Sequence, residues 1–162
     1  MRSSSDTPED WPGDTTIEPY SPENEEDFKS AIVASYQDTL DCPGLCELRT
    51  IDDVLDGHKG VGDFNPKLWT LVRVNSQPAA VLLLSYFPNQ STLELTYLGV
   101  GAQYRGRQLG QRLVRRTLTA AQEYNAKRIT LAVDDQNTPA IRLYKHAGFR
   151  RIDRRTAMIL AV

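Results

Sequence analysis

The sequence is poor in residues that bind metals, since only two cysteines and two histidines occur among its 162 residues. Cys42 and Cys46 are close in the sequence, but no further cysteine or nearby histidine completes a tetrahedral zinc site. His58 and His146 are isolated and are expected on the surface. We therefore predict no metal cofactor and two reduced thiols, with a local redox pair as the alternative for the cysteines.

Long apolar stretches and an excess of positive charge are missing as well. No apolar run approaches the length needed to cross a bilayer, and the polar, acidic start of the chain lacks the hydrophobic stretch of a secretory signal. The formal net charge is -2, without the basic excess that is typical of nucleic-acid binders. These features predict a soluble, cytoplasmic protein with no membrane and no nucleic-acid partner.

Residues 1–15 combine Ser, Pro, Gly and acidic side chains with a single bulky apolar residue, Trp11. Such a segment buries too little apolar surface to offset the entropy of ordering, so we expect a disordered tail or linker. Its abrupt end leaves open that the chain is a piece of a longer protein. Residues 16–162 are long enough to form one domain with its own core.

The hydrophobic pattern of the remaining chain predicts about four helices. Helix-start signals, such as Ser21 followed by Pro22, and a Thr cap at Thr138 mark their beginnings, and Gly148 marks the end of the last one. The longest helix carries an apolar stripe that is opposed by arginines. The helices are expected at residues 22–39, at residues 50–57, after Gly106, and at residues 139–147.

Strand-like runs are expected at residues 16–20, 68–74, 79–87, 93–100 and 129–133. The short, turn-rich connections between the second, third and fourth of these runs indicate antiparallel hairpins. Residues 79–84 are apolar without alternation, which predicts a central strand covered on both faces. We expect residues 149–162 to close the sheet as one bent strand or two short ones, and the fold class is α/β.

The segment from Leu98 to Gly110 places a strand, a glycine-bearing turn and a helix start in succession. Backbone N–H groups in such a turn and in the first helical turn have no intrahelical partner, and the helix dipole adds positive potential. Arg105 and Arg107 add full charges, and Gly106 lets a phosphate approach the backbone. The sequence therefore predicts a phosphate site that is neither a nucleotide P-loop nor a dinucleotide fingerprint.

Two blocks of this chain resemble the GCN5-related N-acetyltransferase (GNAT) superfamily. Residues 103–108, Gln-Tyr-Arg-Gly-Arg-Gln, match its pyrophosphate signature Gln/Arg-x-x-Gly-x-Gly/Ala at Gln103 and Gly106. Gln108 departs from it, because the family usually has Gly or Ala at that position. Residues 137–149 are similar to the family's ending Asn-x-x-Ala-x-x-Leu-Tyr-x-x-x-Gly-Phe, so the resemblance covers about residues 68–160.

The resemblance implies one acetyltransferase domain over residues 16–162, with an α+β fold of six to seven strands in a mixed sheet flanked by about four helices. It also implies that acetyl-CoA, as co-substrate, lies where two neighbouring parallel strands separate, with Gly99 at a strand bulge. Packing alone is the alternative role for Gly99. The residues implied to contact the cofactor are Leu98, Gly99, Val100, Arg105, Gly106, Arg107, Gln108, Leu109, Gly110, Asn137 and Tyr144.

Two side chains are the candidates for proton transfer. Tyr144 is expected to donate a proton to the departing CoA thiolate, since an ordinary phenol stays neutral below a pH of about 10. Glu94 is expected to help remove the proton from the acceptor amine, like the glutamate of the histone-acetylating branch. A core tyrosine and a solvated strand carboxylate are the alternative readings of these two residues.

The predicted function is transfer of an acetyl group from acetyl-CoA to a primary amine of a small molecule or a peptide, by direct attack in a ternary complex. Several acidic residues between Asp38 and Asp56 favour a cationic acceptor. The alternative is a catalytically weak CoA-binding module that regulates a larger protein. A homodimer remains an open expectation.

Overall fold

A computed structural model describes residues 10–46, 48–158 and 160 of the chain. Its strands and helices follow one another as β1 (Thr15–Pro19), α1 (Glu25–Tyr36), α2 (Ile51–Lys59), β2 (Trp69–Val74), β3 (Gln77–Phe87), β4 (Thr92–Val100), α3 (Leu109–Glu123), β5 (Arg128–Leu131) and α4 (Thr138–His146). Short 3-10 turns link several of them. No helix among the described residues has both the length and the apolar composition of a membrane-spanning helix.

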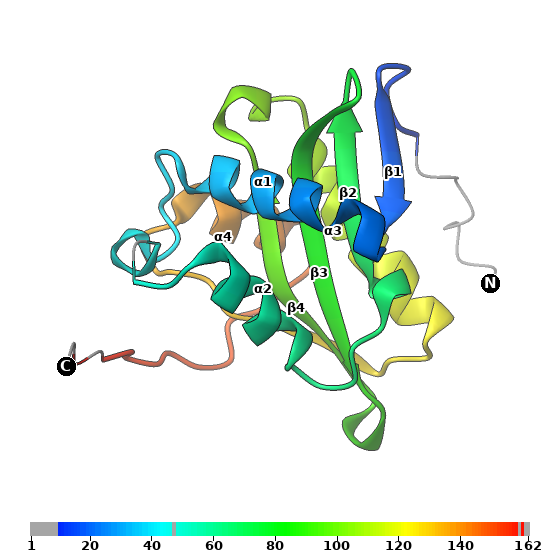
Figure 1. The fold of residues 1–162 in the computed structure, drawn as a ribbon. Helices are drawn as coiled ribbons and strands as arrows, with labels where there is room; N and C mark the ends of the chain where they lie inside the picture. Colours follow the sequence, from blue (N-terminus) through cyan, green and yellow to red (C-terminus); the bar gives the residue numbers. More distant parts are fainter. Residues whose placement is uncertain (1–9, 47, 159, 161–162) are drawn as a thin grey trace.

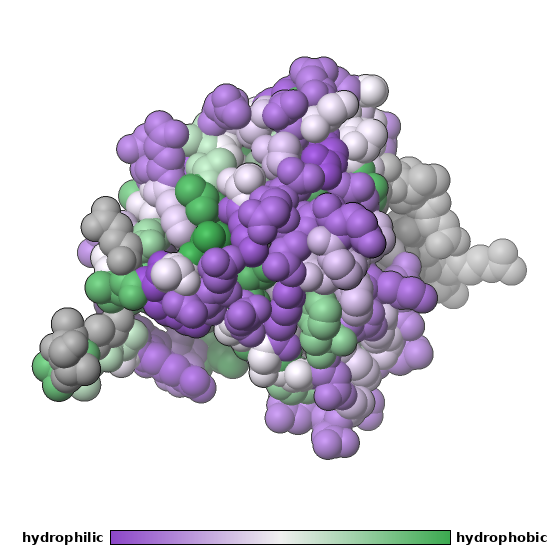
Figure 2. Space-filling model, in the orientation of Figure 1, coloured by the Kyte–Doolittle hydropathy of each residue, from purple (hydrophilic) through white to green (hydrophobic). Residues whose placement is uncertain are grey.

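The strands form one mixed sheet in the order β1-β2-β3-β4-β5. Each neighbouring pair is antiparallel except β4 and β5, which run parallel because α3 connects them. Helices α1 and α2 lie over one face of the sheet, and α3 lies over the other (Figure 1). Figure 2 shows that the α1 and α2 side is mostly hydrophilic on its outer surface.

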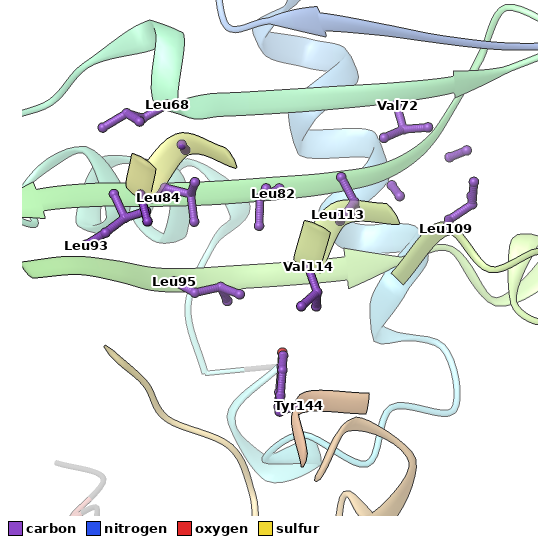
Figure 3. Packing of buried hydrophobic residues seen from close by; sticks show 14 of the residues in the cluster. Leu68, Val72, Leu82, Leu84, Leu93, Leu95, Leu109, Leu113, Val114 and Tyr144 are labelled. Carbon is purple, nitrogen blue, oxygen red and sulfur yellow. The ribbon is translucent and has the colours of Figure 1, made fainter. Parts of the chain in front are cut away.

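Strand β3 is the centre of two hydrophobic cores. Leu82 and Leu84 pack in a cluster with Leu113 of α3, and Figure 3 shows that cluster from close by. Val81 and Leu83 point to the opposite face and pack in a cluster with α1 and α2. All four β3 side chains are buried, which confirms that the non-alternating run belongs to a central strand covered on both sides.

An ionic network joins the start of α1 to α2. Lys59 donates to Glu25 at 2.7 Å, Tyr20 donates to the same carboxylate, and Lys29 pairs with Asp52 at 2.7 Å. The hydrogen bonds from Lys59 and Tyr20 lower the pKa of Glu25 to about 2. The two helices on this face are therefore held together by charge as well as by their apolar sides.

The C-terminal part of the sheet differs from the prediction. The sheet has five strands rather than six or seven, and residues 149–158 and 160 form no strand. Strand β5 has only four residues, so a neighbour would gain few ladder hydrogen bonds. Residues 150–155 contain Ile152 as their one apolar residue, and Arg151 and Arg154 pair with Asp135 instead.

Part of the segment predicted as a tail contacts the rest of the chain. Trp11 packs against the core on the α3 side, and Arg112 lies over its ring at 6.0 Å from the ring centroid. The carbonyl of Asp14 accepts from the N–H of Asn75 at 2.8 Å. The remainder of that predicted tail, residues 1–9, lies outside the described residues.

Two predicted helix boundaries need correction. Helix α1 ends at Tyr36 rather than near Thr39, because Gln37 is extended and Asp38 has a left-handed φ of 52°. The cap of α4 is Asn137 rather than Thr138. Its side chain accepts a hydrogen bond from the N–H of Ala140 at 3.3 Å, which leaves Thr138 inside the first turn.

Candidate active site

Strands β4 and β5 pair over only part of their course. Residues 92–95 of β4 pair with residues 128–131 of β5, whereas β4 continues to Val100. Beyond Leu95, β4 therefore has a strand partner only on its β3 side among the described residues. The resemblance to the GNAT superfamily implied such a separation of two parallel strands, and we call it the opening between β4 and β5.

The bulge of β4 lies at Thr96 and not at Gly99. Tyr97 pairs with Leu83 and Leu95 with Leu84, so Thr96 has no partner in the register. Gly99 instead pairs regularly with Val81, which corrects the predicted bulge. A bulge changes which face the following residues occupy, so Leu95 faces α3 whereas Tyr97 packs in the cluster with α1 and α2.

Gly99 lies close to Ser35 of α1. A Cβ atom placed at Gly99 would lie 2.7 Å from Ser35 Oγ and 2.7 Å from Cε1 of Tyr97. Both distances are far below van der Waals contact. The absence of a side chain at Gly99 is therefore required by packing, which was the alternative reading of this glycine.

The turn before α3 is lined with free backbone donors. A 3-10 turn at Ala102–Tyr104 leads into residues 105–108, and Gly106 has a left-handed φ of 81°. Among the described residues, the N–H groups of Gly106, Arg107 and Gln108 donate to no backbone carbonyl. The first N–H groups of α3 also lack intrahelical acceptors, and its dipole favours an anion there. This geometry suits a diphosphate.

The two arginines of this turn already have protein partners. Nη2 of Arg105 donates to the carbonyls of Ser35 and Gln37 at 3.0 and 2.8 Å. Nη2 of Arg107 donates to Asp14 at 2.6 Å, and this bond lowers the pKa of the Asp14 carboxyl. The Arg107 pair is exposed, so a bound phosphate can compete with Asp14 for the guanidinium.

Gln108 adopts the conformation that glycine favours. Its φ is 62°, it stands at the N-cap of α3, and its exposed side chain makes no capping hydrogen bond. A left-handed conformation costs a residue with a Cβ about 1–2 kcal/mol. The departure from the family signature at Gln108 is therefore also a point of backbone strain beside the donors of the turn.

Tyr144 lies on α4 and is buried, with only 9% of the residue exposed. Figure 3 shows it pointing from α4 toward Leu95 of β4 and Val114 of α3. Burial, with a smaller contribution from Asp41, raises the pKa of Tyr144 to about 12. Its hydroxyl makes no hydrogen bond to another described residue, so this phenol stays protonated at neutral pH and has no competing partner there.

Glu94 lies on the half of β4 that still pairs with β5, opposite Thr130. Because its neighbours Leu93 and Leu95 face α3, its side chain points to the opposite face of the sheet. There it lines a solvent-open hollow together with Arg128 and Thr130. Glu94 is thus accessible and lies one residue before the point where the strands separate.

Two residues that the sequence reasoning did not select also lie beside the opening. The Tyr97 ring contacts the ring of His58 at 5.6 Å between centroids. Burial, with a contribution from Arg49, lowers the pKa of His58, which favours the neutral imidazole. His58 is partly buried rather than on the surface as predicted, whereas His146 is exposed as expected. No sequence motif marks His58, because its position depends on how α2 packs on β4.

The loop after α1 meets the loop after β5 through two reciprocal hydrogen bonds. The N–H of Cys42 donates to Oδ2 of Asp134 at 3.0 Å, and the N–H of Asp134 donates to Oδ1 of Asp41 at 3.0 Å. Backbone donors from Gln136 and Cys42 lower the pKa of Asp134. This bridge places two carboxylates at the end of β5, where its pairing with β4 stops.

The comparison of this chain with known families agrees with that geometry. Residues 7–149 match the sequence model of the acetyltransferase (GNAT) family. The chain belongs to the GNAT family. This GNAT chain is also 35% identical over 103 residues to a mycothiol acetyltransferase of Beutenbergia cavernae, an alignment covering 62% of this chain and 34% of that protein. It spans between 19% and 34% of the length of the curated relatives it matches.

Solved structures share the GNAT fold of this chain. Ard1 from Thermoplasma volcanium superposes with a TM-score of 0.68 at 24% identity, covering 86% of this chain and 85% of that one. Arabidopsis thaliana Naa50, solved with the bisubstrate analogue CoA-Ac-MVNAL, gives a TM-score of 0.65 at 21% identity, with coverages of 86% and 85%. These structural matches confirm the predicted fold.

Proposed function

We propose that this chain transfers an acetyl group from acetyl-CoA to a primary amine by direct attack within a ternary complex. The observation that carries the proposal is that two features occur together. The turn before α3 has free backbone N–H groups, and β4 has an edge that β5 leaves unpaired beyond Leu95. A diphosphate and an extended amide-bearing chain are the two ligand features that such a site suits. Acetyl-CoA, the donor that GNAT enzymes use, carries both.

Each part of the cofactor has a proposed partner. The diphosphate accepts from the backbone N–H groups of residues 106–110 at the positive end of α3. The pantetheine amides pair with the backbone of Leu98 and Val100, taking the place of the missing strand partner. Asn137, whose Oδ1 caps α4, has its amide donors left for the cofactor. The thioester then lies near the bulge at Thr96.

The proposed reaction forms a C–N bond and breaks the C–S bond of the thioester. An alkylamine with a pKa of roughly 10.4 is mostly protonated at neutral pH, so it must first lose a proton. We assign this step to Glu94, acting through water from its accessible position before the bulge. The neutral amine attacks the thioester carbonyl, and Tyr144 donates its proton to the departing CoA thiolate. The nitrogen then gives up its extra proton to water, and the tyrosinate takes a proton back from water, which restores the phenol.

The acceptor is proposed only as a chemical class. One compared protein is named a mycothiol acetyltransferase, and another was solved with the bisubstrate analogue CoA-Ac-MVNAL. Asp41 and Asp134 lie together at the end of β5, and no ion pair to a lysine or arginine involves either one among the described residues. Their charge favours a cationic amine, from a small molecule or a peptide, over an anionic acceptor.

A second candidate function is a CoA-binding module with little or no turnover. Gln108 favours it, because a left-handed glutamine beside the phosphate donors departs from the family signature and would hold the cofactor in a geometry less suited to transfer. The two candidates differ in whether CoA is released when an amine is present.

Free-thiol release from acetyl-CoA across a panel of small amines and peptides tests the proposal. We expect turnover with at least one cationic amine, and a large loss of that turnover in Tyr144→Phe and Glu94→Gln. Glu123→Gln, an exposed carboxylate on α3, is the matched control and should keep wild-type activity. Tight acetyl-CoA binding without thiol release for any acceptor would favour the binding module, and no binding at all would overturn both candidates.

A further inference from the structure

The side chain of Arg105 satisfies the C-terminal end of α1. A helix leaves its last carbonyls without intrahelical partners, and cations near that end are stabilising. Helix α1 has no basic residue in its own last turn. Arg105 supplies the missing donor from the far end of β4, since its Nη2 atom reaches the carbonyls of both Ser35 and Gln37.

Arg105 is turned away from the donors of the diphosphate turn. Its backbone N–H already donates to the carbonyl of Ala102 at 3.4 Å. The free N–H groups begin at the next residue, Gly106, whose left-handed φ of 81° redirects the chain toward α3. Arg105 therefore stands between two parts of the protein, with the phosphate donors on one side and α1 on the other.

The end of α1 sets the path of the loop that follows it. Gln37, whose carbonyl Arg105 holds, is extended, and Asp38 and Cys42 have left-handed φ angles of 52° and 46°. Residues 37–42 thus make a strained path with a hydrogen bond from Arg105 at its start. At its other end, Asp41 and Cys42 bond to Asp134 beside the opening between β4 and β5.

The same end of α1 also orients a side chain of β4. Ser35, the other carbonyl partner of Arg105, has its hydroxyl 2.6 Å from the Tyr97 hydroxyl. Tyr97 follows the bulge where we place the thioester. The Arg105 guanidinium thus bonds to Ser35, which orients Tyr97, and to Gln37, which begins loop 37–42.

We propose that Arg105 is a positioning residue that couples occupancy of the diphosphate turn to the placement of loop 37–42. The inference rests on the proposed binding of acetyl-CoA to this turn. When the N–H groups of residues 106–110 bind the diphosphate, the turn and Arg105 become fixed together. Arg105 then holds the end of α1, so occupancy of the turn fixes loop 37–42 beside the opening.

Hydrogen exchange of the full chain, measured with and without acetyl-CoA, tests this coupling without a known acceptor. In the wild type we expect acetyl-CoA to slow exchange in residues 37–42 by roughly fivefold or more. In Arg105→Gln that protection should be lost, while the Kd for acetyl-CoA rises by less than about threefold, since a neutral side chain loses only long-range attraction. Arg115→Gln removes the same charge from the exposed face of α3 and should keep the protection.

The outcomes separate this inference from the proposed function. No binding of acetyl-CoA to the wild type would overturn the function itself. Binding without slower exchange in residues 37–42 would overturn the coupling alone. An Arg105→Gln variant that keeps loop protection but binds acetyl-CoA about tenfold more weakly would make Arg105 a cofactor ligand instead.

A second variant keeps the test decisive if Arg105→Gln does not fold. Arg105→Lys retains the charge, but its side chain is shorter and its ammonium does not reach the position of Nη2 between the two carbonyls. We expect loop protection between that of the wild type and zero, with an acetyl-CoA Kd like that of the wild type. Full protection in the folded Arg105→Lys variant would contradict a role that depends on holding both carbonyls.

Discussion

The hydroxyl of Tyr97 on β4 donates a hydrogen bond to Ser35 Oγ on α1 across 2.6 Å. The direction follows from the serine, whose own proton is donated to the carbonyl of Ile32. Burial raises the pKa of Tyr97, so this donor stays protonated at physiological pH. The bond crosses directly over Gly99 and connects the open part of β4 to α1.

Removing the Ser35 hydroxyl should cost more than removing the Tyr97 hydroxyl, because Ser35 also donates to the carbonyl of Ile32. We expect Tyr97→Phe to lower the free energy of unfolding by about 1 kcal/mol, Ser35→Ala to lower it further, and the double variant to lose less than the sum of the two. A double-mutant cycle in urea measures the coupling. Strictly additive losses would show that the two hydroxyls do not interact.

Gly99 should tolerate no side chain. Gly99→Ala places a Cβ 2.7 Å from Ser35 Oγ and from the Tyr97 ring, so α1 must move away from β4. We expect a loss of roughly 2 kcal/mol or more in the free energy of unfolding, read from chemical denaturation. The control is Gly44→Ala, whose Cβ would meet nothing within 4 Å. Equal stability of the two variants would contradict the close approach.

Gln108→Gly should stabilise the protein and tighten acetyl-CoA binding. Glycine accepts the φ of 62° without strain, although it adds freedom to the unfolded chain, so the net gain is about 0.5–1 kcal/mol. Removing the side chain also opens the approach to the neighbouring N–H groups. Asn125→Gly at the end of α3, with a φ of 52°, is the control. It should share the gain in stability but leave the acetyl-CoA Kd, measured by calorimetry, unchanged.

Much of the fold could be predicted because its signals are local. The central position of β3 followed from an apolar run without alternation, and the start of α2 followed from Thr50, whose side chain accepts from the N–H of Asp53 as a cap does. The parallel pair of β4 and β5 followed from the resemblance to a family. In each case, a few neighbouring residues contain the information.

The parts that could not be predicted depend on tertiary contacts. The bulge lies at Thr96 because of the register between β3 and β4. Position 99 needs a glycine because Ser35 of α1 lies too close for a side chain, and not because the strand bends there. His58 faces Tyr97 only once α2 has packed on the sheet. Arg105 carried the expected charge, yet nothing in its neighbouring residues shows that its partners would be carbonyls of α1.

The acid side of the stability profile should depend on Glu25. Its folded pKa of about 2 lies below the ordinary glutamate value of 4.5, so its contribution is fully present above about pH 4.5 and is lost as the pH falls toward 2. Glu25→Gln should therefore flatten the fall in stability across that window. Near pH 7 we expect a loss of about 1–2 kcal/mol, after allowing for solvent screening of a partly exposed network.

Thermal unfolding of wild type and Glu25→Gln between pH 2 and 7 measures this window. Glu26→Gln is the matched control, because its carboxylate pairs with Lys29 from a position that is 84% exposed. Its profile should follow that of the wild type. Parallel profiles for Glu25→Gln and the wild type below pH 4.5 would show that another carboxyl controls acid unfolding.

Tyr144 should affect turnover far more than stability. Its hydroxyl has no hydrogen bond within the described residues, so Tyr144→Phe keeps the buried ring and should change the melting temperature little. If the phenol donates a proton to the CoA thiolate, kcat should fall by roughly 10²-fold or more, within the range of general acid catalysis.

Because the pKa of Tyr144 is about 12, the phenol stays protonated across the working range. The pH–rate profile of the wild type should then show no descending limb from this group up to about pH 10. Tyr124→Phe, which removes a hydroxyl bonded to Asn65 away from the opening, is the control and should lower stability without lowering kcat. An unchanged kcat in Tyr144→Phe would return this residue to a role in the core alone.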